Sequence, residues 1–485
     1  MASSFHVENF GCRAARADGE AVSDQLRSAG LCEQQPSTAD VVVVNTCSVT
    51  AEADRSARAF IRRAHRLNPA ARIVVTGCYA QRVPEELASL QGVSAVVGNS
   101  HKALAPQIVL SLLGRTAQNA DSELIKIQMA QAASAPPQVA QVIWADDLFA
   151  HSFLEGPQII PGAQTRPNLK IQEGCWNRCT FCVIPFTRGP SQSLPHSVVL
   201  RQVEGFVAGG GNELVLSGIN LGRWGRDLSD ADRPTLGGLV RQIFERTALP
   251  RLRLSSIEPM DWDTELIGLL ADFGGTSPGS PSAGPGRWGG RLARPAHLPL
   301  QSGSDAVLRR MHRRYRPWHY AEKVATLLRA AGPELTLGAD VMVGFPGETD
   351  AEFEETVELV RTLPFGYLHL FPFSPRPATP AWALHAAQPV PPEAVAERMA
   401  ALRALAAEKT QAHRRSFVGR ELEAITLHTP AELNAHGQTV ALTENFLPVE
   451  FDGRLQANQL VRLRVTGLTA EGTLEAALSN SEITQ

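Results

Sequence analysis

Three features of the sequence predict an α/β protein with three folded regions. Short runs of Val, Ile and Leu alternate with helical stretches up to about residue 113, and again from about residue 166 to 390. From about residue 415 to 480 the chain carries short strand-like runs instead. Apolar strands that alternate with helices are typical of parallel sheets, and closely spaced short strands are typical of small barrels. We therefore expect an N-terminal flavodoxin-like parallel sheet, a central partial (β/α)6 barrel and a small C-terminal antiparallel β-barrel.

The N-terminal region carries the elements of the parallel sheet. Each apolar run is short and bounded by polar residues, which is typical of a strand that is buried on both faces. The predicted strands are residues 5–10, 40–45, 72–76 and 95–97, and the predicted helices are residues 19–29, residues 51–67 and one that begins at Pro84.

Three cysteines occupy equivalent positions in this pattern. Cys12, Cys47 and Cys78 each follow one of the first three predicted strands. Because the carboxyl ends of parallel strands lie at one edge of a sheet, where ligands bind, these thiols could together hold an iron–sulfur cluster with one open iron. The alternative is three unrelated buried thiols. Cys32 follows a helix end, so we expect it at the opposite edge as an incidental thiol.

Six strand–helix units predict the central barrel. Residues 114–165 precede it, and the Ala, Gln and Ser content of residues 118–141 predicts a linker. The stretch Gly274–Gly290 is rich in Gly, Pro and Ser and predicts a disordered surface insertion. The predicted strands are residues 168–172, 213–217, 251–255, 297–300, 335–343 and 367–373, and the predicted helices are residues 197–208, 236–247, 264–273, 318–331 and 350–362.

A Cys-x3-Cys-x2-Cys motif follows the first strand of this region. Cys175, Cys179 and Cys182 can bind three irons of a cubane [4Fe–4S] cluster, whereas ferredoxin-type carriers usually add a fourth Cys. The open iron invites a cofactor or substrate to bind. The alternative is structural zinc, which wants four ligands, commonly in two separated pairs. His297 or His312 could complete such a site, but neither lies at the short spacing of a zinc finger.

Further polar and glycine residues follow the central strands. Function in (β/α) barrels sits at the carboxyl ends of the strands, so the agreement of these positions around one rim favours a binding site. Each short motif alone is equally typical of ordinary turns. The candidates are Ser217, Gly218, Asn220, Ser256, Glu258, Gln301 and Gly344.

The charge distribution gives no global argument for nucleic-acid binding. The 485-residue chain has a net charge of −3, and residues 411–485 contain six Arg, no Lys and nine acidic residues. The C-terminal barrel, with strands predicted at residues 422–427, 439–442, 460–465 and 472–476, could therefore bind RNA or be a structural cap.

Two local basic groups could contact phosphates, or could be solvated faces. The first recurs at helical spacing and the second follows the fourth central strand. They are Arg55, Arg58, Arg62, Arg63 and Arg66, and then Arg309, Arg310, Arg313, Arg314 and Arg316.

The sequence also predicts a cytoplasmic location. The N-terminus lacks the charged-then-apolar pattern of a signal peptide, and the longest β-type apolar run, residues 41–44, is too short to span a bilayer. Exposed thiolates suit a reducing compartment. We expect no membrane partner.

The motifs together resemble those of the methylthiotransferases, a family of radical S-adenosylmethionine (SAM) enzymes. The Tyr after Cys78 and the Pro-Phe after Cys182 resemble the branch that acts on N6-threonylcarbamoyladenosine (t6A) in tRNA. The resemblance implies a cluster domain at residues 1–113, a linker at 114–165, a radical SAM domain at 166–395, a helical connector at 396–414 and a TRAM domain at 415–482. The segments that carry it are residues 44–50, 75–81, 174–189 and 297–305.

The resemblance also implies two [4Fe–4S] clusters, SAM and a role for each cysteine. Cys175, Cys179 and Cys182 would hold the radical SAM cluster, with Phe181 against the adenine of SAM. The other three predicted ligands, at positions 12, 47 and 78, would hold the auxiliary cluster that carries or supplies sulfur. The implied partners are tRNA and a reductant such as flavodoxin or ferredoxin, and the sulfur donor stays open.

Two other functions stay open. The same chemistry could act on isopentenyl-adenosine in tRNA or on an Asp of a ribosomal protein. The alternative from a different class is a non-catalytic RNA-binding protein with structural zinc.

Overall fold

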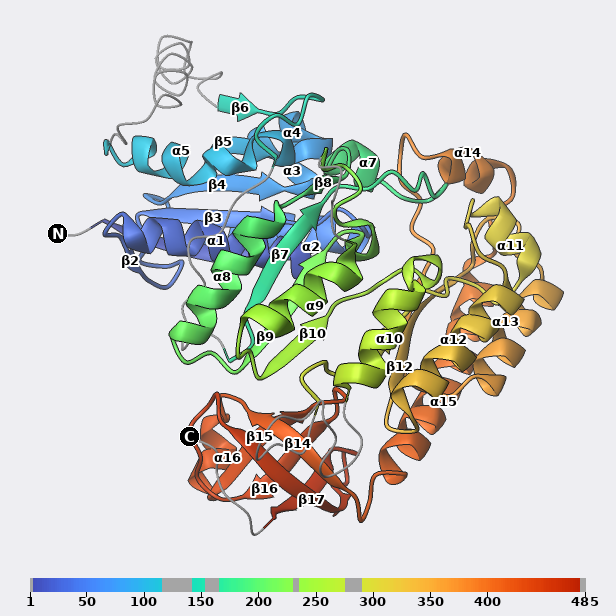
Figure 1. Ribbon diagram of the computed structural model, residues 1–485. Coiled ribbons are helices and arrows are strands. Elements are labelled where there is room, and N and C mark those ends of the chain that lie inside the picture. The colour runs from blue at the N-terminus through green and yellow to red at the C-terminus, as the bar shows by residue number, and fades with distance from the viewer. Residues whose placement is uncertain (1–2, 116–141, 153–164, 230–234, 275–289, 480–485) are drawn as a thin grey trace. The chain divides into compact units, whose positions relative to one another are not determined.

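The computed structural model describes residues 3–115, 142–152, 165–229, 235–274 and 290–479. The chain forms two compact units. The first unit comprises residues 1–157, 173–178 and 182–192, and the second unit comprises residues 158–172, 179–181 and 193–485. Figure 1 shows the elements of each.

The first unit is built on a six-stranded sheet in the order β2-β1-β3-β4-β5-β6, in which every pair is parallel. The predicted N-terminal parallel sheet is therefore confirmed. The strands are β1 (Ser4–Asn9), β2 (Cys32–Glu33), β3 (Val41–Thr46), β4 (Arg72–Gly77), β5 (Val93–Gly98) and β6 (Val142–Trp144), and the helices are α1 (Arg13–Ser28), α2 (Ala51–Leu67), α3 (Cys78–Arg82), α4 (Pro84–Ala88), the 3-10 helix η1 (Asn99–Leu104) and α5 (Ala105–Leu112).

Helix α1 corrects one sequence prediction. It begins at Arg13 rather than at Gly19, so Gly19 lies inside the helix. A Cβ at Gly19 would lie only 1.7 Å from the side-chain oxygen of Asn9. The glycine therefore marks close packing of α1 on the end of β1 and does not mark a helix start.

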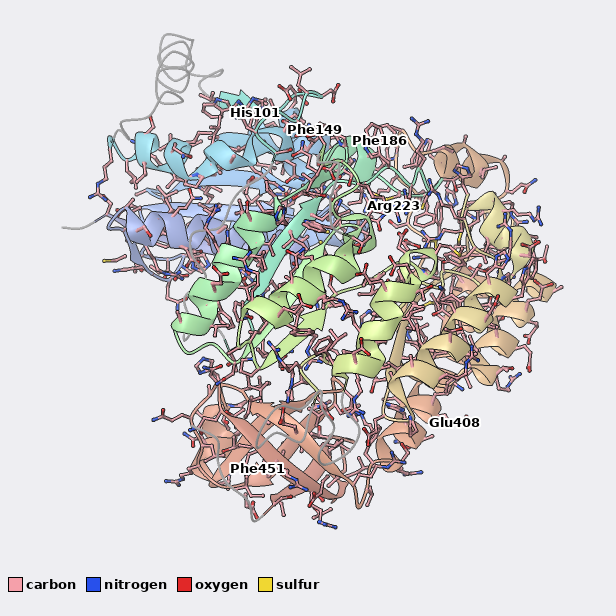
Figure 2. The ribbon with its side chains drawn as sticks, viewed as in Figure 1. His101, Phe149, Phe186, Arg223, Glu408 and Phe451 are labelled. Atoms are coloured by element: carbon pink, nitrogen blue, oxygen red, sulfur yellow. The ribbon has the colours of Figure 1, made fainter. Side chains whose placement is uncertain are left out.

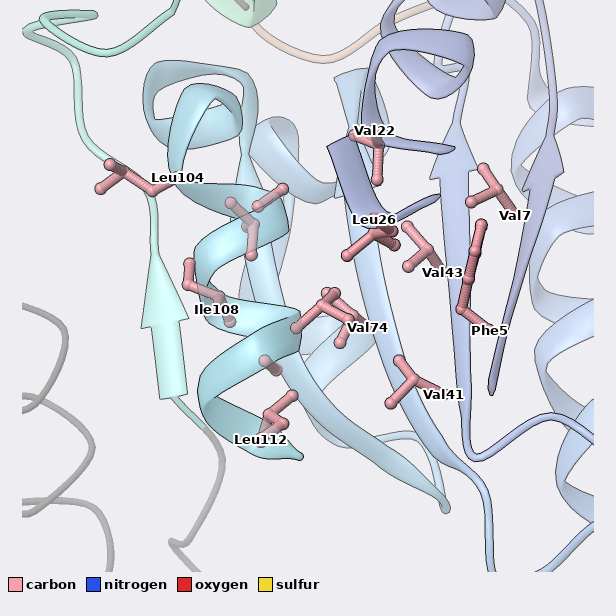
Figure 3. Packing of buried hydrophobic residues seen from close by; sticks show 14 of the residues in the cluster. Phe5, Val7, Val22, Leu26, Val41, Val43, Val74, Leu104, Ile108 and Leu112 are labelled. Carbon is pink, nitrogen blue, oxygen red and sulfur yellow. The ribbon is translucent and has the colours of Figure 1, made fainter. Parts of the chain in front are cut away.

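The sheet has an apolar core on each face, which explains why its strands are continuous apolar runs. Val41 and Val43 belong to the core beneath α1 and α5, whereas Val42 and Val44 belong to the core on the opposite face with α2. Figure 3 shows Val43 beside Leu26 in the first of these cores. Successive residues of one strand thus pack alternately into the cores on the two faces of the sheet.

The six predicted central strands and the short additional strand β8 form two sheets. The first sheet has the order β10-β9-β7-β8 and the second the order β11-β12-β13, and the consecutive strands β9 and β10, β11 and β12, and β12 and β13 pair in parallel. The strands are β7 (Asn168–Glu173), β8 (Gln192–Ser193), β9 (Glu213–Gly218), β10 (Arg251–Leu254), β11 (Pro295–His297), β12 (Thr336–Val343) and β13 (Phe365–Pro372).

The two sheets connect between β10 and β11. A parallel bridge joins Leu252 to Leu292, and the amide of Ile257 donates to the carbonyl of His297 at 3.1 Å. The helices between the strands are α8 (His196–Ala208), α9 (Leu236–Arg246), α10 (Thr264–Phe273), α11 (Asp305–Arg310), α12 (Pro317–Ala331) and α13 (Asp350–Thr362). The predicted partial (β/α)6 barrel is therefore confirmed.

The fourth central strand lies earlier than predicted. In place of the expected strand at residues 297–300, the structure has β11 at Pro295–His297. Residues 298–300 run alongside β12 but are irregular backbone. Leu298 and Leu300 donate to β12 carbonyls, but Pro299 between them has no N–H and cannot extend the ladder.

The C-terminal part of the second unit contains a closed five-stranded barrel in the order β14-β15-β16-β18-β17. The barrel was predicted, but β16 was not. The pair β16–β18 is parallel, whereas the other pairs are antiparallel. Phe451 on β16, labelled in Figure 2, is buried in the barrel core. The elements are α14 (Pro380–Ala387), α15 (Pro392–Arg415), β14 (Glu421–Thr426), α16 (Ala431–Ala435), β15 (Gln438–Thr443), β16 (Pro448–Asp452), β17 (Leu460–Leu468) and β18 (Leu474–Leu478).

Two sequence predictions lie outside the described residues, namely the linker at residues 118–141 and the interior of the insertion, residues 275–289. The division into five domains stays a prediction. Among the helices that the structure describes, none is long and apolar enough to cross a membrane.

Candidate active site

The structure brings Cys12, Cys47 and Cys78 together at the carboxyl edge of the first unit's sheet. Cys12 precedes α1, Cys47 follows β3 and Cys78 begins α3. Burial, then Cys78, then Cys12 raise the pKa of the Cys47 thiol to about 12. The Cys47 thiol therefore resists ionising by itself, and iron bound at this site would supply the positive charge that stabilises its thiolate. The donor set therefore fits a cluster.

The local backbone permits this approach. Gly11 has φ of 108°, and a Cβ there would lie 2.8 Å from the Cys47 sulfur. A side chain at this position would therefore collide with the site. Cys32, by contrast, lies at the other end of β1, where it pairs with Ser4 in the sheet. Both Cys12 and Cys32 are exposed, whereas Cys47 and Cys78 are buried.

Two buried side chains of the same unit donate hydrogen bonds to the Cys78 sulfur. Nε of Arg188 lies 3.2 Å from it and Nδ2 of Asn99 lies 3.3 Å from it. Burial alone would lower the pKa of the Arg188 guanidinium, but Cys78, Glu173 and Asp18 raise it well above its usual value. Arg188 therefore stays charged beside the thiol.

A buried ion network holds Arg188 in place. Its Nη1 lies 2.7 Å from Glu173 and 3.1 Å from Asp18, and Lys102 pairs with both of these carboxylates. Two cations thus balance two anions, which limits the cost of burying them. Gly189 follows directly and packs against the ring of Phe149, labelled in Figure 2. Sequence analysis did not assign these residues, because Asp18, Lys102 and Arg188 lie far apart along the chain.

Within the Cys-x3-Cys-x2-Cys loop, backbone amides face the sulfurs of Cys175 and Cys182. The amide of Asn177 lies 3.4 Å from the Cys175 sulfur, and that of Ile184 lies 3.4 Å from the Cys182 sulfur. Donors of this kind stabilise thiolates and tune cluster potentials. Cys175 and Cys182 belong to the first unit and Cys179 to the second. The convergence of the three thiols on one cluster remains a prediction from their spacing.

Cys179 has a buried arginine of its own in the second unit. Nη1 of Arg313 lies 3.2 Å from the Cys179 sulfur, and its other nitrogens bond Glu258 and Tyr315. Burial would lower the pKa of the Arg313 guanidinium, but Tyr315, Glu258 and Cys179 raise it well above its usual value. Arg313 thereby connects the predicted rim residue Glu258 to a predicted cluster ligand.

The second predicted basic group is largely neutralised. Arg309 and Arg316 pair with Asp305, Arg310 pairs with Glu352, and Arg313 is buried. These contacts favour an internal role over a phosphate-binding patch, and within this group only Arg314 has no described ion partner.

The predicted rim residues lie beyond the carboxyl ends of the central strands. Ser217 and Gly218 end β9, and the amide of Asn220 donates to Gln172 at 2.6 Å. Gly344 has φ of 76° and donates to Glu348 at 2.8 Å. The remaining predicted residues Ser256 and Phe181 are half-buried, and Gln301 is buried with φ of 65°.

Three buried oxygens of this rim have no hydrogen-bond partner among the described residues. They belong to the side chains of Ser217, Ser255 and Gln301. Buried polar atoms are almost always satisfied, so unpaired ones at a strand-end rim suit a polar ligand such as SAM. The sequence pattern places Ser255 inside the predicted strand at residues 251–255, so it does not mark this residue as part of the rim.

A further polar cluster spans the second central sheet. Oxygens of Asp340 lie 3.1 Å from His297 and 3.2 Å from His369, and the other nitrogen of His297 lies 3.1 Å from the Tyr367 hydroxyl. Burial would raise the pKa of Asp340, but the two histidines hold it below its usual value. Asp340 thus pairs with both histidines, and the ligand atoms of His297, Asp340 and His369 all lie within 4.8 Å of one another, where they could hold a cation.

Comparison with known proteins identifies the class first. Residues 292–360 match the radical SAM superfamily, and residues 4–98 match a family described as "Uncharacterized protein family UPF0004". The radical SAM methyltransferase TsrM of Kitasatospora setae, solved with cobalamin and a [4Fe–4S] cluster, aligns with TM-score 0.54 and 16% identity over 79% of this chain and 77% of that chain. The fold is that of radical SAM enzymes.

The family follows from curated relatives. Threonylcarbamoyladenosine tRNA methylthiotransferase MtaB of Bacillus subtilis is 32% identical over 93% of this chain and 90% of its own length, and that of Aquifex aeolicus is 32% identical over 94% and 99%. A tRNA-2-methylthio-N(6)-dimethylallyladenosine synthase of Parafrankia sp. is 32% identical over 96% and 84%. The chain belongs to the methylthiotransferase family of radical SAM enzymes and is an enzyme of the transferase class.

Proposed function

We propose that the protein inserts a sulfur atom and a methyl group at C2 of the t6A adenosine just 3′ of the anticodon in tRNA. The observation that carries this proposal is the convergence of Cys12, Cys47 and Cys78, because it supports a second cluster site in addition to the radical SAM motif. A radical SAM enzyme with one cluster has no evident source of inserted sulfur.

The six cysteines divide into two ligand sets. Cys175, Cys179 and Cys182 hold the radical SAM cluster, and Cys12, Cys47 and Cys78 hold the auxiliary cluster. When bound, the radical SAM cluster and SAM would supply the radical chemistry that removes hydrogen from C2, and a second SAM would supply the methyl group. SAM contacts come from Phe181 and from the rim residues Ser217, Gly218, Asn220, Ser256, Glu258, Gln301 and Gly344.

Buried arginines position one thiolate of each set. Arg188 holds a positive charge next to the Cys78 sulfur, and Arg313 holds one next to the Cys179 sulfur. A charge-assisted hydrogen bond stabilises the anionic thiolate and fixes its direction. These arginines are positioning residues, because neither is a metal ligand.

Exposed aromatic side chains support an RNA substrate. Trp176 lies within the cysteine loop, directly after Cys175, and Phe186 follows the loop; both belong to the first unit, and each is 54% exposed. Aromatic faces stack on unpaired bases, which is how single-stranded loops are commonly recognised. Reduction would come from a flavodoxin or ferredoxin, and the proposed location is the cytoplasm.

The branch of the family is tested by nucleoside analysis. We expect a bacterial strain that lacks 2-methylthio-t6A to gain this nucleoside when it expresses the wild-type protein, but not when it expresses Cys47→Ala. Appearance of the 2-methylthio form of isopentenyl-adenosine instead, or a mass increase on a ribosomal protein, would assign a different substrate. Zinc without iron or sulfide in the purified protein would contradict the enzyme assignment altogether.

A further inference from the structure

Helix α2 carries a row of arginines whose two ends differ in their pairing. Near its start, Arg55 pairs with Glu52, and Arg58 bonds Tyr79 and Glu86. Towards its end, Arg62 and Arg66 are exposed and have no ion-pair or hydrogen-bond partner among the described residues. Glu52 and Glu86 therefore neutralise the arginines near the start of α2. The positive charges of Arg62 and Arg66 near its end are not compensated by any described carboxylate.

These two arginines line a surface pocket of about 460 Å³. Its other lining residues are Ala59, His65 and Gln91, so no carboxylate lines it. Gly92 forms part of the turn that precedes β5, with φ of 87°, and a Cβ there would lie 2.4 Å from the His65 ring. The glycine therefore lets this turn lie close against α2.

The donor set of the pocket suits an anion with several oxygens. Two guanidinium groups supply charge and paired N–H donors, and the amide of Gln91 supplies further donors. Nδ1 of His65 is buried against the Gly92 turn, so the donors that this pocket offers to an anion are those of the two arginines and Gln91. Phosphate groups are the anions that arginine forks recognise most specifically.

We propose that this pocket binds a backbone phosphate of the RNA substrate, so that α2 is a docking surface for the stem of the RNA. The inference rests on the proposed function, which makes tRNA the substrate. The N-cap of helix α2, Thr50, lies three residues after Cys47, and Arg66 lies about 24 Å further along the helix axis. An RNA stem carries phosphates over such a distance, whereas a small anion needs a single point.

The C-terminal barrel is less suited to this task. Arg462 and Arg464, on β17, both pair with Glu421. Residues 411–485 also contain more acidic residues than arginines. Phosphate contacts need cations that are not already neutralised, so the arginines of α2 are the better candidates.

The test measures binding of a fluorescent anticodon stem–loop RNA to full-length protein at several salt concentrations. The variant is Arg62→Gln/Arg66→Gln, and the matched control is Arg403→Gln/Arg415→Gln, which removes two exposed arginines of α15. We expect the α2 variant to bind about tenfold more weakly, and the slope of log affinity against log salt to fall by about 1.5. Arg62→Lys/Arg66→Lys should recover most of the affinity.

The possible outcomes separate this inference from the proposed function. Unchanged RNA affinity and salt slope in the α2 variant, with wild type binding normally, would overturn the inference alone. Failure of the wild-type protein to bind the RNA would contradict the proposed function. Inorganic phosphate binding that is lost in the α2 variant while RNA affinity is unchanged would identify a small-anion site and overturn the RNA assignment. Equal iron content in all variants checks that the first unit is intact.

Discussion

The two cysteine triads differ in how the chain assembles them. Cys175, Cys179 and Cys182 lie in one short loop after β7, whereas Cys12, Cys47 and Cys78 come from the ends of three strands. The loop triad is close together because its three cysteines are only a few residues apart in the sequence. The strand-end triad exists only because the sheet is parallel, which brings the carboxyl ends of β1, β3 and β4 to one edge.

The triads nevertheless share one structural feature. In each, a buried arginine donates to one sulfur, with Arg188 at Cys78 and Arg313 at Cys179. The surroundings of the two arginines differ. The carboxylates beside Arg188 are buried, since Glu173 is 0% exposed, whereas Glu258 beside Arg313 is 20% exposed. The following predictions use this contrast.

The largest expected effect comes from removing either triad. Triple Cys→Ala variants at the loop or at the strand ends should each reduce about eight irons per chain to about four. The loop variant should lose reductive SAM cleavage, whereas the strand-end variant should keep it and lose only methylthiolation. Iron and sulfide assays and 5′-deoxyadenosine formation measure these effects.

Cys32→Ala is the matched control, because this thiol is exposed at the opposite end of β1. It should retain about eight irons and full activity. If the wild-type protein holds about four irons and the loop variant holds none, the strand-end cysteines bind no cluster. The protein would then have one cluster site instead of two.

Much of this contrast could be predicted from the sequence. The loop triad follows from spacing, and the strand-end triad follows because each of its cysteines comes after an apolar run. Arg188 could not be predicted, since Asp18 and Lys102 reach it only through the folded sheet. Strand β16 was also missed, because its five residues include Pro448, Glu450 and Asp452, which resemble a loop.

The next effect is on the stability of the first unit. Arg188→Gln removes one buried cation from beside Glu173 and Asp18 and leaves Lys102 next to both carboxylates. We expect the free energy of unfolding of the apoprotein to fall by about 3–5 kcal/mol, the usual cost of breaking a buried ion pair. Urea denaturation measures it. Arg188→Lys keeps the charge and should lose less; equal losses in both variants would show that charge is not the stabilising factor.

Arg313→Gln should have a smaller effect of the same kind. The carboxylate left behind, Glu258, is partly exposed, so water can solvate it. We expect a loss of about 1–3 kcal/mol in the free energy of unfolding, with a larger relative loss of SAM cleavage than of auxiliary-cluster iron. A stability loss as great as that of Arg188→Gln would remove the proposed difference between the two arginines.

Arg313 also shows a limit of sequence analysis. Its sequence neighbours form a basic run, which suggested a phosphate contact or a solvated face. The sequence could not reveal that Arg313 is buried against Cys179, or that Asp305 and Glu352 neutralise its neighbours. Arg62 and Arg66 also belong to a run of arginines, on α2, but they have no ion-pair partner in the part of the chain that the structure describes. Only the folded structure distinguishes the two basic groups.

The smallest expected effect concerns Asn99, which donates to the Cys78 sulfur and to the carbonyl of Thr187. Asn99→Ala removes one hydrogen bond to the sulfur while Arg188 remains. Because hydrogen bonds to cluster sulfurs stabilise the reduced state, the potential of the auxiliary cluster should become more negative. A bond worth about 1 kcal/mol corresponds to about 40 mV for one electron. Redox titration followed by electron paramagnetic resonance, in the loop-triad variant that lacks the other cluster, measures this shift directly. Thr187→Val serves as the control, because it alters a neighbouring side chain without removing a donor to the sulfur. A potential unchanged in Asn99→Ala would mean that Arg188 alone sets the charge at Cys78, and the two triads would then be alike in having a single donor side chain each.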